Sequence, residues 1–416
     1  MTPDFTFVFL LFFGLTVAVR LWLKLRHIRY VASHRNAVPA EFAERIALAD
    51  HQKAADYTVD RSKAAILHTL IDASVLLAFT LGGGLTALHE VWSSQLDGLA
   101  YGLAMIFSIM IISGLIDLPL SLYSQFVIEA RHGFNRMTLG LFFTDLLKQT
   151  VLGLAIGAPV IAAVLWLMGA MGEYWWLYVW LFWSGFNLLI MFIYPTWIAP
   201  LFNKFSPLED GEMKSRIEAL LTRCGFRSSG LFVMDGSKRS SHGNAYFTGF
   251  GNNKRIVFFD TLLARLQPAE VEAVLAHELG HFRKKHVVKR MVLMFAGSLA
   301  FLWLLGQLID APWFYAGLGV PAQNTTLALI LFFLVMPVFT FPLGPLMSHL
   351  SRRHEFEADA YAAQHASASD LVQALVKLYQ DNASTLTPDP LHSLFHDSHP
   401  PAAQRIAHLQ AQEKTA

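Results

Sequence analysis

Charge and cysteine are both scarce in this sequence. Only 15% of its 416 residues are charged, whereas soluble domains carry about 25%, and this deficit argues against an ordinary soluble enzyme. The 32 Lys and Arg residues balance 31 Asp and Glu residues to a net charge of +1, which leaves no basic excess for binding nucleic acid. A single cysteine, Cys224, excludes an internal disulfide and a cysteine-based metal site. Any metal must be held by histidines and carboxylates.

Long hydrophobic runs are abundant instead. A window of about 19 residues predicts seven membrane-spanning helices, at Phe5 to Leu25, Ala64 to Leu88, Leu99 to Tyr123, Thr150 to Met171, Trp175 to Ile198, Met291 to Ile309 and Thr326 to Leu350. The first run is interpreted as a retained span, because its positive charges follow the apolar stretch and do not precede it. We therefore expect an all-α polytopic membrane protein.

The basic residues indicate the orientation of these spans. All 32 Lys and Arg residues fall on one side, in or beside the connections after spans one, three, five and seven. Because Lys and Arg resist translocation, the N-terminus is expected outside and the C-terminus in the cytosol. The chain ends without a dilysine retrieval signal, and we expect a bacterial inner membrane, with the endoplasmic reticulum membrane as the alternative.

Two cytosolic stretches are long enough to fold together against the membrane. The chain divides into residues 1–200 with five spans, a cytosolic domain at 201–290, two spans at 291–350 and a C-terminal cytosolic segment at 351–416. Within the first stretch, periodicity predicts helices at Glu212 to Cys224 and Ala269 to Lys285. Three short runs between them, Leu231 to Met234, Ala245 to Phe250 and Arg255 to Phe259, indicate a small antiparallel sheet.

The motif H-E-L-G-H, His277 to His281, lies inside the second of these helices. Residues four apart share a helix face, so both imidazoles can bind one ion while Glu278 reaches its water. Hydrolytic zinc takes three protein ligands and keeps an open position. The third ligand is sought in Ser351 to Ala362, where Glu355 and Asp359 are one turn apart. His354 and Glu357 are the competitors.

Several further motifs, in matching order from about Asp56 to the C-terminus, carry a resemblance to a known family. They are G-F-N-R-M-T (Gly133 to Thr138), I-A-P-L-F-N-K-F-S-P-L (Ile198 to Leu208), H-G-N-A-Y-F-T-G (His242 to Gly249), E-F-E-A-D-A-Y-A (Glu355 to Ala362) and S-H-P-P-A-A-Q-R-I (Ser398 to Ile406). With H-E-L-G-H, the chain resembles the integral-membrane CAAX prenyl proteases of type I. This implies seven helices around a water-filled intramembrane chamber, with a small α+β zincin-like cytosolic cap.

The resemblance also implies roles for individual residues. One Zn²⁺ would be bound by His277, His281 and Glu355, with Glu278 as the catalytic base and Asp359 supporting a ligand. Asn244 and His399 would position the substrate and help to stabilise the oxyanion. An edge strand beginning at Asn244, with Ala245 and Tyr246, can pair with a peptide in extended conformation.

Other polar residues receive weaker interpretations. Four groups within the spans fit a hydrated chamber or a transporter pathway: His68, Asp72, Asp117 and Asn187. Three near G-F-N-R-M-T are expected to form an ion-pair cluster at the cytosolic mouth: Glu129, Arg131 and Asp145. Arg405 is expected to anchor the C-terminal tail, and His392 and His396 to be surface residues.

The sequence therefore predicts a zinc-dependent membrane endopeptidase. The family resemblance implies cleavage of C-terminal tripeptides from prenylated proteins, by a monomer whose partners are the lipid bilayer and an extended, lipidated or unlipidated substrate. One alternative is a heat-shock-type membrane metalloprotease for quality control. Another is a channel or transporter with a relic zinc site, against which the intact Glu278 argues.

Overall fold

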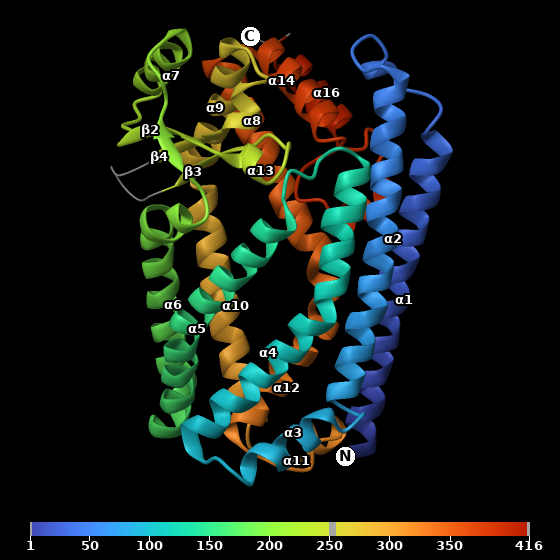
Figure 1. Ribbon diagram of the computed structural model, residues 1–416, viewed down its shortest axis with the longest axis vertical. Coiled ribbons are helices and arrows are strands. Elements are labelled where there is room, and N and C mark those ends of the chain that lie inside the picture. Colours follow the sequence, from blue (N-terminus) through green and yellow to red (C-terminus); the bar gives the residue numbers. More distant parts are fainter. Residues whose placement is uncertain (1, 249–254, 414–416) are drawn as a thin grey trace.

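The computed structural model describes residues 2–248 and 255–413. In these ranges, seven helical segments are long and apolar enough to cross a membrane, and they run roughly along the long axis (Figure 1). They are built from α1 (Thr2–His34), α2 (Leu48–Phe79), α4 (Gly98–Tyr123), α5 (Leu139–Ala170), α6 (Trp175–Ile193), α10 (His286–Leu308) and the consecutive pair α12 (Thr325–Thr340) and α13 (Gly344–His365). The predicted fold class and number of spans are confirmed.

Two of the predicted spans, the second and the last, run across a break between helices. The second span ends at Phe79, and the chain then turns through Gly83, whose φ of 78° favours glycine, into the short helix α3 (Gly84–Ser93). The last predicted span is broken at the single turn Phe341–Leu343. A hydropathy window misses both breaks, because the residues on either side of each remain apolar.

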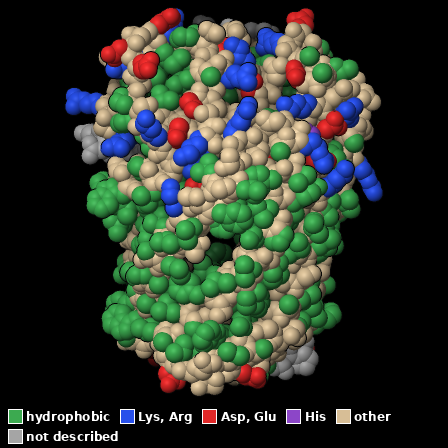
Figure 2. All heavy atoms as spheres, in the orientation of Figure 1, with side chains coloured by type: hydrophobic (Ala, Val, Ile, Leu, Met, Phe, Trp, Pro, Cys, Tyr) green, Lys and Arg blue, Asp and Glu red, His purple; other side chains and the backbone are tan. Residues whose placement is uncertain are grey.

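The seven spans form a closed ring. Contacts run from α1 to α2, α4, α5, α6, α10 and α12, and α12 returns to α1. The ring is hollow: cavities of about 830, 470 and 270 Å³ lie among its helices. Figure 2 shows one face, where a hollow interrupts a broad hydrophobic band and the visible Lys and Arg side chains gather over the end that carries the sheet and the C-terminus.

That end is a cap of short helices and one four-stranded sheet. The strands β1 (Phe205–Pro207), β2 (Gly230–Met234), β3 (Ala245–Thr248) and β4 (Arg255–Phe259) are ordered β1-β2-β4-β3. β2 and β4 are parallel and the other two pairs are antiparallel, so the prediction of an antiparallel sheet is wrong for this pair. The reason is that β3 reverses the chain between them. Residues 249 and 250, included in the predicted third run, lie outside the described residues.

Helices complete the cap around α9 (Pro268–Arg283), which contacts α7 (Glu212–Arg223), α13 and α14 (Ala368–Asp381). A capping box sets the start of α9, and in it the Gln267 backbone N–H donates to Glu270 at 2.7 Å. The remaining helices are α8 (Asp260–Leu263), α11 (Pro312–Gly317), α15 (Pro390–His396) and α16 (Ala402–Glu413). The four-segment division of the chain stays a prediction.

Candidate metal centre

The two halves of the centre meet where α9 packs against α13. Gly280, inside H-E-L-G-H, allows a backbone-to-backbone approach: a Cβ there would lie 2.9 Å from Ala358 Cα and 3.0 Å from its carbonyl oxygen. On the α9 face toward the cap core, Val271, Leu275 and Leu279 are buried. The apolar periodicity of the helix therefore aims its two histidines at α13.

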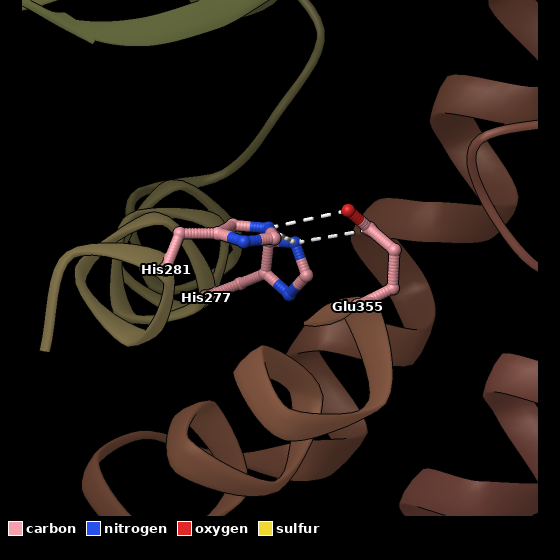
Figure 3. A group of neighbouring side chains, drawn as sticks. All are labelled: His277, His281 and Glu355. Atoms are coloured by element: carbon pink, nitrogen blue, oxygen red, sulfur yellow. Dashed lines mark hydrogen bonds and ion pairs between the residues drawn. The ribbon is translucent and has the colours of Figure 1, made fainter. Parts of the chain in front are cut away.

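His277, His281 and Glu355 converge at this contact (Figure 3). One ligand atom from each residue lies within 4.8 Å of the others. The two Nε2 atoms are 3.1 Å apart, and Glu355 Oε1 lies 3.3 Å from His281 Nε2. Of the candidates for a third ligand, the structure thus brings Glu355 to the histidine pair. Glu357 points elsewhere, as described below.

The arrangement of donors fits a zinc ion. Each Nδ1 has its own partner, so Nε2 of both histidines can present its lone pair to the same point: His277 Nδ1 lies 2.8 Å from Asp359, and His281 Nδ1 lies 3.0 Å from His286 Nδ1. Glu355 Oε2 is buried without a hydrogen-bond partner among the described residues. Two imidazoles, a carboxylate and an unsatisfied buried oxygen form a donor set that zinc accepts.

His277 is held by a buried ion pair. Asp359 is fully buried and accepts two hydrogen bonds from Arg405, at 2.9 and 2.6 Å. Burial and the charge of Arg405 lower the pKa of His277, but the carboxylates of Asp359 and Glu355, which lie 2.8 and 3.5 Å from its ring nitrogens, outweigh them and raise the pKa to about 9. A proton therefore competes with a metal ion for this site. Arg405, expected only to anchor the tail, fixes the centre itself.

His281 is held by a second chain of contacts, which the sequence pattern does not indicate. His286 is buried, and its Nε2 lies 3.0 Å from Glu357. His286 is the first residue of α10, and it reaches His281 because Lys285, with φ 58°, breaks the helix before it. No glycine or proline marks this break in the sequence, so only the fold reveals it.

Glu278 and His399 lie on the accessible side of the centre. Glu278 is half-buried and has no hydrogen bond or ion pair with any described side chain. His399 Nε2 lies 3.6 Å from Glu355 Oε1. The His399 side chain is 62% accessible, and partial desolvation by the surrounding protein lowers its pKa. Both residues are placed where a substrate could meet them.

The expected substrate strand is present at a sheet edge. β3 pairs only with β4 among the described strands, leaving its other side open. Asn244 precedes it, is exposed and accepts a hydrogen bond from the Ala245 backbone N–H at 2.8 Å. Tyr246 lines a cavity of about 370 Å³ in front of the sheet. The described contacts do not join these residues to the metal ligands.

The predicted cluster of Glu129, Arg131 and Asp145 is wrong, because each pairs with a different partner. Tyr57 donates to Glu129 at 2.6 Å, Arg131 donates to Asp60 at 2.9 Å, and Arg239 donates to Asp145 at 2.8 and 3.0 Å. The partners come from α2 and from the cap. They lie far apart in sequence, so local spacing could not identify them.

The interpretation of His392 as a surface residue is also wrong. Its ring stacks on buried His27 of α1 at 4.0 Å. Burial, with the neighbouring positive charges of His27 and His396, lowers the pKa of His392 to about 3. His396 is largely exposed and stacks obliquely on His392, so the prediction holds for His396 alone.

Within the ring, three of the four polar span residues meet. His68 Nδ1 lies 2.9 Å from Asp72 and His68 Nε2 lies 3.7 Å from Asp117. The side chain of Asn187 instead donates to the Trp183 carbonyl of its own helix. The first three face one another across α2 and α4, as expected for the wall of a hydrated hollow.

Comparison with known proteins agrees with this geometry. Residues 27–204 match the family described as CAAX prenyl protease N-terminal, five membrane helices, and residues 207–413 match peptidase family M48. A CAAX prenyl protease 1 homolog from Arabidopsis thaliana is 37% identical, over 87% of this chain and 88% of its own. The chain belongs to the CAAX prenyl protease 1 family.

Further members of this family agree over most of their length. The Homo sapiens homolog is 34% identical, over 91% of this chain and 89% of its own. The crystal structure of S. mikatae Ste24p is similar, with a TM-score of 0.90 and 32% identity, covering 97% of this chain and 98% of that one. The predicted family and the predicted class of zinc metallopeptidase are confirmed, and the protein is a multi-pass membrane protein.

Proposed function

We propose that this protein is a zinc endopeptidase that cleaves prenylated proteins near the C-terminus. The observation that carries the proposal is the convergence of His277, His281 and Glu355 beside Glu278. The names of the relatives, CAAX prenyl proteases, support the substrate class. We also propose one zinc ion per chain and a monomer.

The residues of the chain have distinct tasks in this reaction. Zinc, when bound by the three ligands, supplies a Lewis acid and makes a water molecule more acidic. Glu278 accepts the proton of the attacking water and delivers it to the leaving amine. His399 donates a hydrogen bond to the developing oxyanion. Asp359 fixes the ring of His277, as carboxylates next to ligating histidines do.

Substrate binding follows from the open edge of β3. An extended peptide added there would form backbone hydrogen bonds with β3, and the enzyme would make few contacts that depend on the peptide's side chains. Asn244, Ala245 and Tyr246 are the residues that we assign to this contact. Backbone recognition suits an enzyme whose substrates differ in sequence.

The location of the centre is proposed to be cytosolic. The concentration of Lys and Arg at the cap end supports this orientation (Figure 2). The relatives named above are eukaryotic, which supports the endoplasmic reticulum membrane over the bacterial inner membrane favoured by the sequence alone. A quality-control protease is less well supported, because relatives named CAAX prenyl proteases match this chain over most of its length.

The test is cleavage of a prenylated CAAX peptide by the purified, zinc-loaded protein. Glu278→Gln should keep its zinc and lose about 10²- to 10⁴-fold in kcat, the usual contribution of a general base. Glu272→Gln, on the same helix but paired with Arg216 and Arg223, is the control and should stay active. Cleavage that persists in Glu278→Gln would refute the assigned mechanism.

A second experiment addresses the edge strand. N-methylation of the substrate next to the scissile bond removes an amide hydrogen without changing any side chain. If the peptide binds by strand pairing, cleavage should be abolished. Equal rates for methylated and unmethylated peptides would exclude β3 as the binding edge.

A further inference from the structure

A cavity lies where the end of the fifth membrane span meets the sheet of the cap. It has a volume of about 370 Å³, and Pro195 and Pro200 line it from the span while Phe232 and Arg255 line it from the sheet. Both prolines belong to the segment Gly172–Leu201, which is long and apolar enough to cross a membrane. The cavity therefore lies between one end of a span and the cap.

The sheet separates this cavity from the metal centre. Ile256 and Phe258 of β4 are buried in the hydrophobic core that α9 also enters. Because successive side chains of a strand point to opposite faces, Arg255 and Val257 lie on the other face. Tyr246 of β3 is paired with Val257 and lines the cavity with it. The cavity is thus distinct from the site that α9 and α13 form.

The lining of the cavity carries positive charge without a counter-charge. Lys204 and Arg255 are the charged residues among the described residues that line it, and neither forms an ion pair with a described carboxylate. The Arg255 guanidinium lies over the Phe232 ring, 5.2 Å from its centre, a cation–π contact that leaves its N–H groups available to an acceptor. The stretch at 249–254 contains no Asp or Glu in its sequence. An anion is the natural complement of this lining.

Other hydrogen-bond donors line the cavity beside the two charges. Asn203 Oδ1 accepts a hydrogen bond from Arg239 at 2.9 Å, so its amide nitrogen remains a donor. The backbone of Tyr246 lies at the sheet edge assigned to the substrate, whereas its hydroxyl forms no hydrogen bond with a described residue. Lys204 is exposed, but its backbone N–H donates to Asp235 at 2.7 Å, which fixes its position. Such charged and neutral donors bind phosphate oxygens.

Exposed aromatic residues indicate that the cavity lies at the membrane surface. Tyr194 and Trp197 belong to the turn that follows α6 and are 51% and 76% exposed. Figure 1 shows the strands of the cap over this end of α6. Trp and Tyr concentrate at the headgroup level of a bilayer. In the cytosolic leaflet this level contains anionic lipids, and basic pockets beside membrane helices bind their headgroups.

The volume and the apolar lining favour a lipid over a simple ion. Binding sites for small ligands measure about 300–1,000 Å³, whereas one water molecule occupies about 30 Å³. Pro200 and Phe205 give the cavity an apolar side, which suits an amphipathic ligand better than free phosphate. An acidic protein segment would match the charges but would not account for the exposed aromatic residues beside the cavity.

We propose that this cavity binds the headgroup of an anionic phospholipid of the phosphatidylinositol class, with Lys204 and Arg255 on its phosphate. The amide of Asn203 and the hydroxyl of Tyr246 then bond to the ring hydroxyls. The bound lipid connects the end of α6 to the sheet and so holds the cap on the membrane. This inference uses the cytosolic orientation proposed above and does not depend on the catalytic activity.

The first experiment measures lipid affinity by native mass spectrometry of the purified full chain. Phosphatidylinositol should bind at least about tenfold more tightly than phosphatidylcholine, and Lys204→Ala with Arg255→Ala should remove this preference, because charge-assisted hydrogen bonds are lost. The matched control is Arg227→Ala with Lys238→Ala, which removes the same charge from exposed side chains outside the cavity. Lys204→Ala alone, at an exposed side chain, is the variant to use if the double variant does not fold. Native affinity in the folded cavity variants would overturn the proposal.

The second experiment identifies the source of the phosphate. Photoreactive phosphatidylinositol in phosphatidylcholine vesicles should label peptides that line the cavity in the native protein, but not in the double variant. A soluble inositol phosphate and an acidic peptide serve as competitors, and neither should reduce the labelling at a concentration equal to that of the lipid. Displacement by the inositol phosphate would overturn the lipid in favour of a soluble ligand. Displacement by the acidic peptide would overturn it in favour of a protein partner.

The outcome for the cavity is separable from the orientation and the function proposed above. Purified protein meets the lipid on both sides, so binding is measured whichever way the chain crosses the membrane. A topology reporter that placed the cap outside the cytosol would refute the orientation alone. Loss of peptide cleavage in Glu278→Gln leaves the lipid measurement unaffected.

Discussion

Replacing Gly280 by alanine should damage the metal centre without touching a ligand. The new Cβ would lie 2.9 Å from Ala358 Cα and 3.0 Å from Ala358 O, whereas carbon contacts are optimal at about 3.5–4.0 Å. Both contact atoms belong to the backbone and cannot rotate away. The helices α9 and α13 must therefore separate by roughly 0.5–1 Å to restore normal contact.

Two opposing energies decide the effect on stability. Alanine is favoured over glycine within a helix by about 1 kcal/mol, while overpacking a close contact costs about 1–3 kcal/mol. The net change in the free energy of unfolding is at most modest, so the protein should still fold. Metal ligation is less tolerant, because ligand distances must hold within about 0.2 Å. With Glu355 on the displaced helix, zinc affinity should fall at least tenfold, or about 1.4 kcal/mol.

The assay is competition for zinc between the purified protein and a chromogenic chelator, with activity measured in parallel. Gly297→Ala is the control: Gly297 lies within helix α10, and a Cβ at this position would meet nothing within 4 Å. This variant should keep native zinc affinity. Gly280→Ala binding zinc within twofold of the native protein would refute the close-packing argument.

Three further predictions follow from particular contacts. Asp359→Asn should weaken zinc binding about 10- to 100-fold, which chelator competition would measure. It should also destabilise the metal-free protein in thermal unfolding, because Arg405 stays buried without its main partner. An unchanged zinc affinity would contradict this prediction. The pKa of His392, about 3, lies below its value of 6.5 in the unfolded chain. The contribution of neutral His392 to the stability of the folded protein is therefore complete above pH 6.5 and is lost as the pH falls from 6.5 toward 3. His392→Gln should flatten this part of the pH profile of thermal unfolding. A reporter active only outside the cytosol should be silent after Ala416 and active when inserted near Gly317, and the reverse pattern would overturn the orientation.

The helix that carries H-E-L-G-H could be predicted from the sequence, because its information is local. Apolar periodicity at Val271 and Leu275 sets its buried face, and the i, i+4 spacing of His277 and His281 follows from the helical repeat. The spans could be predicted for the same reason, since hydropathy is a property of consecutive residues. Their boundaries were less accurate where a turn such as the one at Gly83 joins two apolar helices.

Partners from distant segments could not be predicted in this way. Arg405 and Asp359 meet His277 from two other helices, and His286 reaches His281 only because the chain breaks at Lys285. Neither contact leaves a periodic signal. The parallel pairing of β2 with β4 likewise depends on the path of β3 between them.

The sequence by itself determined that this chain crosses a membrane, which side carries its basic residues, and that one helix offers two histidines and a glutamate to a metal. Tertiary structure decided the third ligand. Glu355 and Glu357 are two residues apart, so they point about 200° apart around α13, and sequence alone does not say which face meets α9. The backbone contact at Gly280 settles it, turning Glu355 toward the histidine pair and Glu357 toward His286.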